Sequence, residues 1–530
     1  MIPQVASLLS PLALALASGA PAAAPPRPAP ALVVVITVDQ CRADYLERWR
    51  GQLTGGVAWL LAHGADFTRA FQDHAMTETA PGHATVLSGR NPHSTGIVRN
   101  EEGVEDSTAG LIGVAGPGAS PRRFRGTELF DWIRARYPDA RALSVSRKDR
   151  GAILPLGRAR QQVYWYEGGR FTTSRYYADA LPGWVEAFDA GLPAAIAADS
   201  AWTLLLPARD YAEPDSEPYE HGGRDVVFPH RLPATPARAA AAIEGMPFMD
   251  SLTLALALDG VTRLRLGAGP QPDLLAISLS TTDAVGHAFG PDSREIHDQV
   301  LRVDRYLGRF LDSLFRLRDP RRIVIALTAD HGVTPYPAWS RAHGDPAARA
   351  VSLDSLVAAT GAALAARAGP GDWIRFFSVG MLAMDRAGLA ARGVNVDSVV
   401  AELAGRMRAT PGVLRVDTPR SLAAADTARD AVARRWRNAI PPGLGVELVV
   451  TLAPGDVWGR EPLPDAEHGQ PSDADSHVPL LIAGPGVRRG RYTGRVQVAD
   501  LAPTLARLLG VRPLQQLDGR ALKEIVSDAR

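Results

Sequence analysis

Cysteine and lysine are both scarce in this sequence of 530 residues. Cys41 is the only cysteine, so the chain forms no internal disulfide, and its fold must depend on core packing or on bound metals. Lys+Arg total 58, yet only Lys148 and Lys523 are lysines. Arginine supplies almost every other cation, so the lysine in the run SRKDRG requires a particular reason.

An excess of charge of one sign is also absent. The 58 basic residues nearly balance the 57 acidic ones, which leaves a formal net charge of +1. Such a chain has no basic field with which to hold nucleic acid and no acidic tail. The length allows one large domain with insertions, or two or three domains. We expect small-molecule partners and no nucleic acid.

A hydrophobic run long enough to span a membrane is missing as well. The apolar run from Val5 to Ala17 is too short, and small residues and a Pro/Ala linker follow it. This order is typical of a signal peptide, which we place at residues 1–24, although a basic start is lacking. An apolar anchor or a disordered tail is the alternative. The signal predicts a periplasmic or secreted protein with no transmembrane span in the mature chain.

Three apolar runs rich in β-branched residues each end in an acidic residue. They are ALVVVITVD (31–39), DLLAISLSTTD (273–283) and RRIVIALTADHG (321–332). Continuous runs of this kind indicate buried parallel strands. Residues 294–317 have apolar residues at helical spacing, which makes a strand, helix, strand unit with a right-handed crossover. The pattern predicts an α/β fold with a large, mostly parallel sheet and helices on both faces.

Two long stretches interrupt this pattern. Residues of about 152–268 are rich in aromatics, Pro and Gly, and residues of about 370–456 combine short strand-like and helix-like pieces. A fourth apolar strand, HVPLLIAGPGV (477–487), and a closing helix at 498–510 follow. We expect one catalytic domain over 25–530, in which the two stretches are insertions that cover the site edge of the sheet.

Acidic and imidazole side chains gather at the strand ends, where open α/β sheets form their sites. These residues are Asp39, Asp283, His287, Asp330, His331 and His477. Asp283 and His287 are four residues apart, so one helical turn would place both on one face. Mixed carboxylate and imidazole ligands suit zinc, and manganese or iron less well. Each residue alone fits a cap, a turn or a satisfied histidine, so the prediction of metal binding rests on the joint pattern.

A hydroxyl residue stands at the start of another predicted helix. In MTETAPGHATVLSG (76–89), Thr79 precedes Ala80 and Pro81, and proline suits the first helical turn. Thr79 would then lie at a helix N-terminus, where backbone N–H groups favour a threonine alkoxide and the phosphoryl group that it attacks. A plain N-cap threonine fits the local sequence equally well.

With these motifs in place, the sequence resembles a known superfamily. Six blocks occur in order through nearly all of the mature chain: ITVDQCRADYL, TETAPGHATVLSGRNPHSTGIVRN, SRKDRGAILPLGR, STTDAVGHAFGP, ALTADHG and DADSHVPLLIAGPGV. They resemble the alkaline phosphatase superfamily, in its type I phosphodiesterase/nucleotide pyrophosphatase-like branch. The resemblance is closest to the threonine-nucleophile alkaline phosphomonoesterases that contain a lysine and an arginine in the site. It implies an alkaline phosphatase-like α/β fold and phosphate ester substrates.

The resemblance also implies roles for the site residues. By this resemblance, the ligands of one zinc would be Asp39, Asp330, His331 and the Thr79 oxygen. The ligands of the other zinc would be Asp283, His287 and His477. Two divalent ions ~4 Å apart can clamp the attacking and leaving oxygens of an in-line phosphoryl displacement. We therefore expect two Zn²⁺ per chain, with Thr79 as the nucleophile that forms a phosphothreonine, which water then hydrolyses.

Three further residues resemble phosphoryl-binding groups of this branch. Asn100, in GIVRN, matches an asparagine that donates to a phosphoryl oxygen. Lys148 and Arg150 lie in SRKDRG, which resembles a segment that the monoesterases have and the diesterases lack. A monoester dianion has an additional charged oxygen, and the compact ammonium of a lysine suits a crowded oxygen better than a guanidinium. A solvated turn is the alternative for this run. The lysine thus predicts phosphate monoesters as substrates.

Some residues depart from the family pattern or have no assigned role. After Asn100 the chain reads EEGVED, where an aromatic-containing run is expected, so the pocket wall or the leaving-group preference should differ. Cys41 stands two residues after Asp39 and is expected to be a small buried thiol rather than a ligand. His83 and His468 are expected to have supporting or structural roles.

Three other functions compete with this interpretation. A phosphodiesterase or nucleotide pyrophosphatase with the same metals is the closest, and Lys148 and Arg150 argue against it. A sulfatase needs a Cys or Ser nucleophile followed by Pro and then Arg, whereas Thr79 is followed by Ala-Pro-Gly-His. An inactive exported binding protein is disfavoured because the nucleophile and all seven ligand positions are present.

Overall fold

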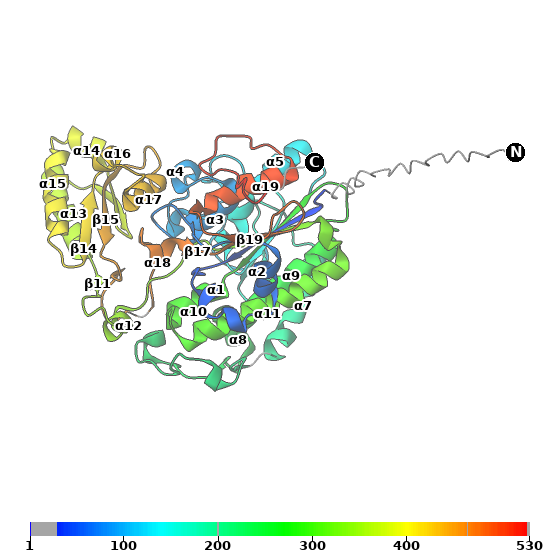
Figure 1. Ribbon diagram of the computed structural model, residues 1–530. Helices are drawn as coiled ribbons and strands as arrows, with labels where there is room; N and C mark the ends of the chain where they lie inside the picture. The colour runs from blue at the N-terminus through cyan, green and yellow to red at the C-terminus, as the bar shows by residue number, and fades with distance from the viewer. Residues whose placement is uncertain (2–28, 199–200, 464, 527–530) are drawn as a thin grey trace.

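Figure 1 shows the computed structural model of the chain as a large body with a smaller lobe, drawn in yellow, at one side. The structure describes Met1 and the residue ranges 29–198, 201–463 and 465–526. The predicted signal peptide, residues 1–24, therefore lies outside the described residues except for Met1.

The β-branched apolar runs form the centre of a mixed sheet in the large body. β1 (Leu32–Val38) lies between β9 (Asp273–Leu279) and β10 (Ile323–Thr328) and is parallel to both. All three strands are buried along their whole length, which explains why their sequences are continuously apolar rather than alternating. Because they are parallel, their carboxyl ends meet at one edge of the sheet, where Asp39 follows β1 directly and Asp330 follows β10 after one residue.

The full sheet has nine strands, in the order β19-β2-β18-β10-β1-β9-β4-β5-β6. The five strands from β10 to β5 are parallel, whereas β18 and β6 pair antiparallel with their inner neighbours. The remaining strands are β19 (Gly490–Tyr492), β2 (Ala65–Phe67), β18 (Leu480–Ala483), β4 (Ala142–Ser146), β5 (Gln162–Glu167) and β6 (Arg170–Thr172). The predicted α/β fold is confirmed, and its sheet becomes mixed toward both edges.

Helices cover both faces of this sheet (Figure 1). One layer contains α2 (Gly56–His63), α9 (Phe248–Arg263) and α11 (Arg294–Leu317), and the opposite layer contains α3 (Thr79–Ser88), α5 (Leu129–Arg136) and α19 (Leu501–Leu509). Helix α11 is the crossover from β9 to β10 that its apolar spacing predicts. Helix α3 is buried in all of its residues, which fixes the position of its N-terminus firmly in the body.

The smaller lobe has its own antiparallel sheet and its own core. The strand order is β12-β13-β15-β14, with β12 (Ile374–Ser378), β13 (Met381–Met384), β15 (Val446–Leu452) and β14 (Val413–Asp417). Helices α13 (Asp354–Ala368) and α15 (Val396–Arg408) pack against it. We call this sheet with its helices the small sheet. It contains the second expected insertion, residues of about 370–456.

The first expected insertion, residues 152–268, is different. It supplies β5 and β6 to the main sheet, and its last helix, α9, packs directly against β4 and β9. Short strands flanked by Gly and Pro do not produce the long buried run by which the other main-sheet strands are recognised. This segment is therefore in part a continuation of the main sheet and its helical layer.

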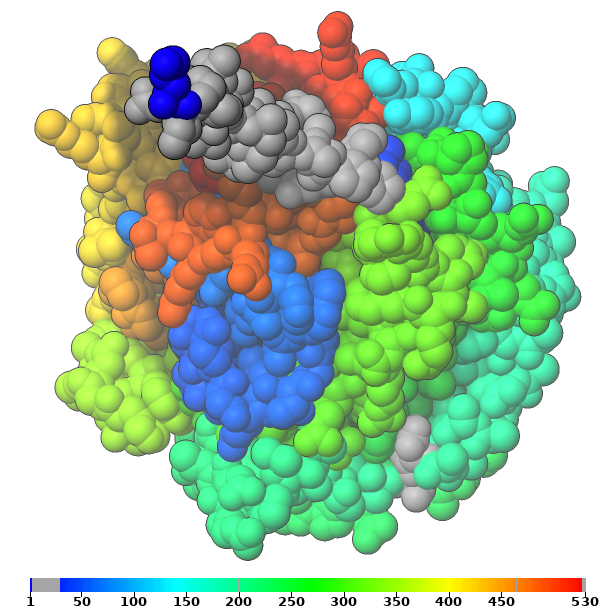
Figure 2. Space-filling model, turned by 45° about the vertical axis from the view of Figure 1, so that its right-hand side comes forward, coloured from blue at the N-terminus to red at the C-terminus, as the bar shows by residue number. Residues whose placement is uncertain are grey.

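Early and late parts of the chain lie side by side on one face in Figure 2, where blue segments adjoin orange ones. The strand pairs agree, because β2 pairs with both β18 and β19. Within the described ranges, no single helix has the length and hydropathy to cross a membrane; the pair Pro236–Gly245 and Phe248–Arg263, bent by 92°, passes by length and composition alone.

Candidate active site

Three carboxylates meet at the carboxyl edge of the main sheet. Asp39 follows β1, Asp330 follows β10, and Asp283 lies in the first turn of α10 (Thr281–Phe289), which follows β9. All three are buried. The Asp39 Oδ1 atom accepts no hydrogen bond from any described residue. A buried carboxylate oxygen without a donor is costly unless a cation binds it, so this edge has the properties of a cation site.

His331 joins Asp39 and Asp330 in a first candidate metal group. One ligand atom of each lies within 4.8 Å of the others. The His331 Nε2 atom is 3.6 Å from Asp39 Oδ1 and 3.7 Å from Asp330 Oδ2. Two ligands bound at about 2.0–2.1 Å to a tetrahedral zinc would lie ~3.3 Å apart, so this spacing fits a shared ion. The Thr79 Oγ1 atom lies 3.5 Å from the same imidazole nitrogen.

A second candidate metal group contains Asp283 and His468, which also lie close to His331, together with the neighbouring His287. The His287 Nε2 atom is 3.5 Å from Asp283 Oδ1 and 3.2 Å from His468 Nε2. The His468 Nε2 atom is 4.0 Å from Asp283 Oδ1, and its ring stacks on His331 at a centroid distance of 3.9 Å. The two groups therefore adjoin each other, as a site for two ions requires.

The three imidazoles share one hydrogen-bonding arrangement. Each places Nδ1 beside a backbone carbonyl oxygen: His331 beside Gly332 at 2.9 Å, His287 beside Ala466 at 2.6 Å and His468 beside Thr77 at 2.7 Å. An imidazole that donates through Nδ1–H keeps Nε2 as a lone-pair donor. All three Nε2 atoms then face the carboxylates with the lone pair that a metal ion needs.

The prediction that His477 belongs to the second group is wrong. His477 forms β17 (His477–Val478), which pairs with β3 (Ala70–Phe71), and its ring stacks on Phe71. Its Nε2 atom lies 2.9 Å from the Thr68 carbonyl oxygen, so this nitrogen is already engaged. Cross-strand stacking next to β3 holds the ring there. His468 takes its place in the ligand group; it lies in a loop without periodicity, and its one sequence signal was the run EHG.

Thr79 is the first residue of α3, and the extended residue Glu78 is its N-cap. The Thr79 hydroxyl lies between His331 Nε2, at 3.5 Å, and Lys148 Nζ, at 3.3 Å. It is buried at the positive end of the helix dipole, beside both candidate metal groups. This is the position that the sequence analysis predicts for a nucleophile.

Asn100 is held beside the first turn of α3 by two hydrogen bonds. The Ala80 N–H donates to Asn100 Oδ1 at 2.8 Å, and the Asn100 N–H donates to Glu78 Oε2 at 2.7 Å. Since the carbonyl end of the amide is occupied, the Nδ2 group retains its two donors. Burial raises the pKa of the accepting Glu78 carboxyl to about 7, against the lowering effects of the Asn100 N–H and of Arg150.

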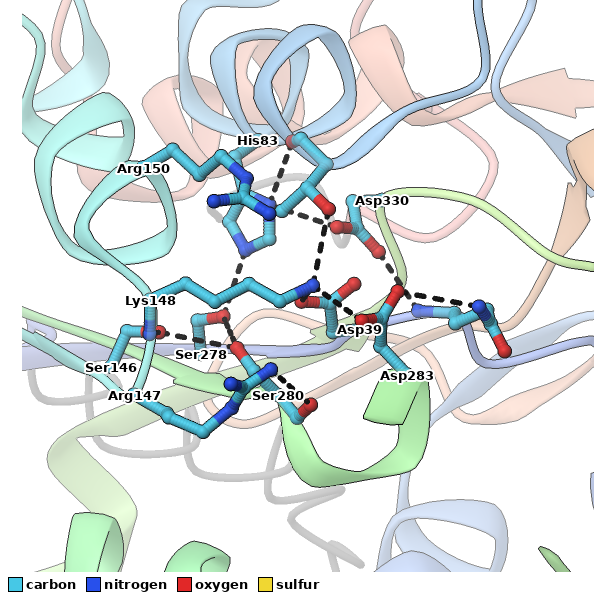
Figure 3. A network of polar contacts seen from close by, with 12 residues as sticks. Asp39, His83, Ser146, Arg147, Lys148, Arg150, Ser278, Ser280, Asp283 and Asp330 are labelled. Carbon is cyan, nitrogen blue, oxygen red and sulfur yellow. Dashed lines mark hydrogen bonds and ion pairs between the residues drawn. The ribbon is translucent and has the colours of Figure 1, made fainter. Parts of the chain in front are cut away.

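Lys148 lies at the centre of the carboxylates (Figure 3). Its Nζ atom is 2.8 Å from Asp39 Oδ2 and 2.6 Å from Asp283 Oδ2. The lysine is buried and stands at the N-terminal end of α6 (Asp149–Ile153), directly after the turn that follows β4. Arg150 lies in α6, two residues after Lys148 (Figure 3). Lys148 therefore contacts one carboxylate from each metal group as well as the threonine.

The electrostatics of this cluster show an excess of negative charge. Burial raises the pKa of Asp39 to about 8, and Asp283 and Asp330 add to this rise. Burial would raise the pKa of Asp283 too, but Lys148 and His287 hold it well below its ordinary value. Burial lowers the pKa of His287, yet Asp283 raises it to about 9. Bound protons and the neighbouring cationic side chains thus compensate the buried negative charge, as expected of a site that binds cations.

His83 lies one turn into α3 and supports this arrangement. Its Nδ1 atom lies 3.0 Å from both the Thr79 carbonyl oxygen and Asp330 Oδ2, and its Nε2 atom lies 2.8 Å from Ser278 Oγ. From there, hydroxyl contacts of 3.3, 3.3 and 3.0 Å lead to the Lys148 N–H through Ser278, Ser280 and Ser146 (Figure 3). His83 therefore links the threonine segment and a metal-group carboxylate with the lysine segment.

The small sheet reaches the edge of the site through its β12–β13 hairpin. At the tip, Val379 has a φ of 43° and contacts Gly469, where an added Cβ would lie 2.3 Å from its Cγ1. Gly469 follows the candidate ligand His468 directly. The Arg99 guanidinium lies 4.0 Å from the centroid of the Phe376 ring, next to Asn100. An aromatic side chain from the small sheet thus packs on the residue that precedes Asn100, whereas the local run EEGVED has no aromatic residue.

The fold and the site together define an alkaline phosphatase-like α/β protein, with Asp/His groups that could hold metal ions beside a threonine at a helix N-terminus. Residues 33–442 match the family of type I phosphodiesterases/nucleotide pyrophosphatases. The chain belongs to this family, in the branch that contains the alkaline phosphatases PhoK and PafA.

Two of these relatives match along nearly their full length. Alkaline phosphatase PhoK of Sphingomonas sp is 32% identical over 515 residues, which cover 92% of this chain and 90% of PhoK. Alkaline phosphatase PafA of Elizabethkingia meningoseptica is 28% identical over 530 residues, 93% of each chain. The crystal structure of wild-type PafA has a TM-score of 0.86 at 27% identity and covers 94% of this chain and 99% of that one. A solved PafA variant that replaces a threonine by serine, and an asparagine, a lysine and an arginine by alanine, matches equally well.

Proposed function

We propose that this protein is an exported, two-zinc phosphatase that hydrolyses phosphate monoesters through a covalent intermediate on Thr79. The observation that carries the proposal is the position of Lys148, whose Nζ lies 3.3 Å from Thr79 Oγ1 and within ion-pair distance of a carboxylate from each metal group. A fixed ammonium beside the nucleophile would stabilise the additional charged oxygen of a monoester dianion. The names of the relatives PhoK and PafA support the same activity.

The residues present fit two zinc ions. One ion would be held by Asp39, Asp330, His331 and the Thr79 oxygen, and the other by Asp283, His287 and His468. Bound there, two zinc ions would supply Lewis-acid stabilisation of the attacking and leaving oxygens. The imidazoles fit this role because all three present Nε2 toward the carboxylates, and Asp39 fits because its buried Oδ1 accepts no hydrogen bond within the described chain.

The protein side chains then carry out the two steps of phosphoryl transfer. The Thr79 hydroxyl loses its proton to solvent, and its oxygen forms a bond to phosphorus while the bond from phosphorus to the ester oxygen breaks. The leaving alkoxide then takes up a proton from solvent and departs as the alcohol. Asn100 Nδ2 and the cations of Lys148 and Arg150 would bind the phosphoryl oxygens during this step. Attack by water on the phosphothreonine then releases inorganic phosphate and restores the hydroxyl.

A phosphodiesterase or nucleotide pyrophosphatase is the second candidate, and the name of the family favours it. The two functions use the same metal groups and the same threonine. They differ in the charge around the oxygens that the metals do not bind: a diester has one negative charge and an organic substituent there. Lys148 and Arg150 favour the monoester, since both would face that substituent in a diester.

The deciding experiment compares the hydrolysis of an aryl phosphate monoester and an aryl phosphate diester by Lys148→Ala and wild type. We expect monoester kcat/KM to fall by some powers of ten, each ~1.4 kcal/mol of lost stabilisation being worth tenfold, while diester hydrolysis changes little. Lys148→Arg should not restore the monoester rate, because a planar guanidinium does not replace a compact ammonium. Lys523→Ala, at the other, exposed lysine, is the matched control and should behave as wild type. Equal losses on both esters would make the diesterase the better assignment.

Export is proposed on the pattern of residues 1–24 alone. The short apolar run, the small residues and the Pro/Ala linker support it. Sequencing of the N-terminus of the protein recovered from the periplasm or the medium tests this part: a start near residue 25 is expected. A chain that remains in the cytoplasm with Met1 intact would contradict export and leave the assignment of the active site unchanged.

A further inference from the structure

Gln40 contacts both candidate metal groups at once. Its backbone N–H donates to Asp330 Oδ1 at 3.1 Å, and its side-chain Nε2 donates to Asp283 Oδ1 at 3.3 Å. It directly follows Asp39 and is completely buried. A single residue therefore follows Asp39 along the chain and donates hydrogen bonds to the carboxylates of Asp330 and Asp283.

The backbone of Gln40 is held in an unfavourable conformation. Its φ is 62°, in the left-handed region that residues other than glycine rarely adopt. This conformation allows the peptide N–H to reach Asp330 while the side chain reaches Asp283. A glycine would adopt the same backbone more easily but would have no amide to donate. Strain that is retained at such a position indicates that the side chain has a function.

The neighbouring helix α10 packs closely against the side-chain amide of Gln40. Gly286 lies in α10 between the ligands Asp283 and His287, and a Cβ added to it would lie 1.9 Å from Gln40 Oε1. The three heavy atoms nearest to that Cβ all belong to Gln40. The Oε1 atom itself accepts no hydrogen bond from any described residue. Close packing against a glycine, rather than a hydrogen bond, thus fixes the orientation in which Nε2 faces Asp283.

We propose that Gln40 is a positioning residue that sets the geometry of the second metal group relative to the first. Its peptide N–H fixes Asp330 of one group, and its amide fixes the Oδ1 atom of Asp283 in the other. This is the Asp283 oxygen that faces the His287 and His468 imidazoles. A neutral donor orients the oxygen and leaves it a lone pair for the ion. The proposal rests on the two metal groups of the proposed function.

The variant Gln40→Gly separates the two contacts, because it keeps the peptide N–H and removes the amide. The probe is zinc chloride titrated into metal-free protein in competition with a chromogenic chelator. Loss of a hydrogen bond that orients a ligand typically costs 10–100-fold in metal affinity. We expect a loss of about that size for one of two zinc equivalents and no change for the other. Arg265→Gly, at an exposed residue that also has a positive φ of 55°, is the matched control and should bind as wild type.

A double-mutant cycle gives a sharper test. Gly286→Ala alone should weaken the same zinc equivalent, because its methyl group displaces the Gln40 amide. In the Gln40→Gly background the methyl group has space, so Gly286→Ala should add no further loss. Gln40→Asn tolerates the backbone but is one methylene shorter, and it should resemble Gln40→Gly. The metal-free Gln40→Gly protein should still unfold cooperatively, because relief of the backbone strain offsets part of the cost of the cavity that the lost side chain leaves.

Several results would overturn the proposal. Equal weakening of both zinc equivalents, additive losses in the cycle, or unchanged binding by Gln40→Gly would each exclude the positioning role. Loss of cooperative unfolding in the metal-free Gln40→Gly protein would make Gln40 a structural residue instead. If the wild-type chain takes up no zinc, the proposed function fails together with this inference; if it takes up two equivalents and Gln40→Gly does too with equal affinity, only this inference fails.

Discussion

The candidate active site and the small sheet differ in how their charged side chains are paired. In the site, buried carboxylates lie close together, and burial raises the pKa of Asp39 to about 8. In the small sheet, the Arg386 guanidinium binds both oxygens of Glu447, at 2.8 and 2.7 Å, and Asp397 at 2.9 Å. These residues line a hollow of about 580 Å³, yet their charges are already paired. The size of a hollow is thus a poorer guide to function than a group of buried carboxylates that outnumbers its cations.

The largest expected effect tests the chemistry of the site. Thr79→Ala should lower the monoester kcat by about three powers of ten or more, because the nucleophile is removed. Thr79→Ser should keep most of the rate, since the hydroxyl remains at the helix N-terminus. Steady-state kinetics with an aryl phosphate monoester would measure both. Wild-type turnover by the alanine variant would instead indicate direct attack by water or another nucleophile.

The next effect distinguishes two histidines that lie close together in the sequence. His468→Ala should lose about one of two zinc equivalents and most of the activity, because the second group then has two protein ligands. His477→Ala should retain both, because its ring packs on Phe71. Zinc analysis of each purified variant after dialysis gives the answer. The opposite pattern would restore His477 to the ligand group and remove His468 from it.

Substitution of Glu220 tests whether the ionisation of a buried carboxyl is also costly outside the candidate active site. It lies in η5 (Glu220–Gly223), which packs against α10, and burial raises its pKa to about 9, with Glu295 and Glu217 adding to the rise. The unfolded chain ionises at a lower pH than the folded one, so stability falls as the pH rises from about 4.5 toward 9.

Glu220→Gln removes this titration. The variant should therefore be stabilised, by about 1 kcal/mol or more at pH 8 and by less at pH 5, given ~1.4 kcal/mol for each pKa unit. Thermal unfolding at the two pH values measures the difference. A stabilisation that is the same at both would show that the carboxyl does not titrate in this range.

The smallest effect is expected in the small sheet. Arg386→Ala should destabilise the protein by about 1 kcal/mol or less, because its ion pairs are half exposed, and should leave phosphatase activity unchanged. Denaturant unfolding together with monoester kinetics would measure both quantities. A large loss of activity would show that the hollow beside Arg386 communicates with the site, and the comparison of the two regions would need revision.

The sequence predicts most of the site because its residues follow recognisable strands. Asp39, Asp283 and Asp330 each come at or just after the end of a continuous apolar run, and parallel strands bring such ends to one edge. His468 gives no comparable signal, since its loop lies between elements and is placed by the Thr77 carbonyl oxygen, far away in the sequence.

The error at His477 has a related cause. The strand β18, which follows His477, runs antiparallel to β10, and its first residue, Leu480, pairs with Thr328 at the carboxyl end of β10. His477 therefore lies near the edge of the sheet at which the site forms. Pairing of β17 with β3 then turns the imidazole to Phe71. Sequence patterns identify the long central strands, whereas two-residue strands such as β17 and β3 form through tertiary contacts that have no local signal.

The position of β1 at the centre of the sheet also determines when the protein can fold. This strand is the first that the described residues form, but its neighbours β9 and β10 begin only at Asp273 and Ile323. Its apolar run therefore remains without partners until more than half of the chain has been synthesised. Pairings between such distant segments slow folding and prolong the exposure of apolar surface. The same topology keeps the newly made chain open for longer, which is the state in which a polypeptide can still be bound by chaperones or threaded through a narrow channel.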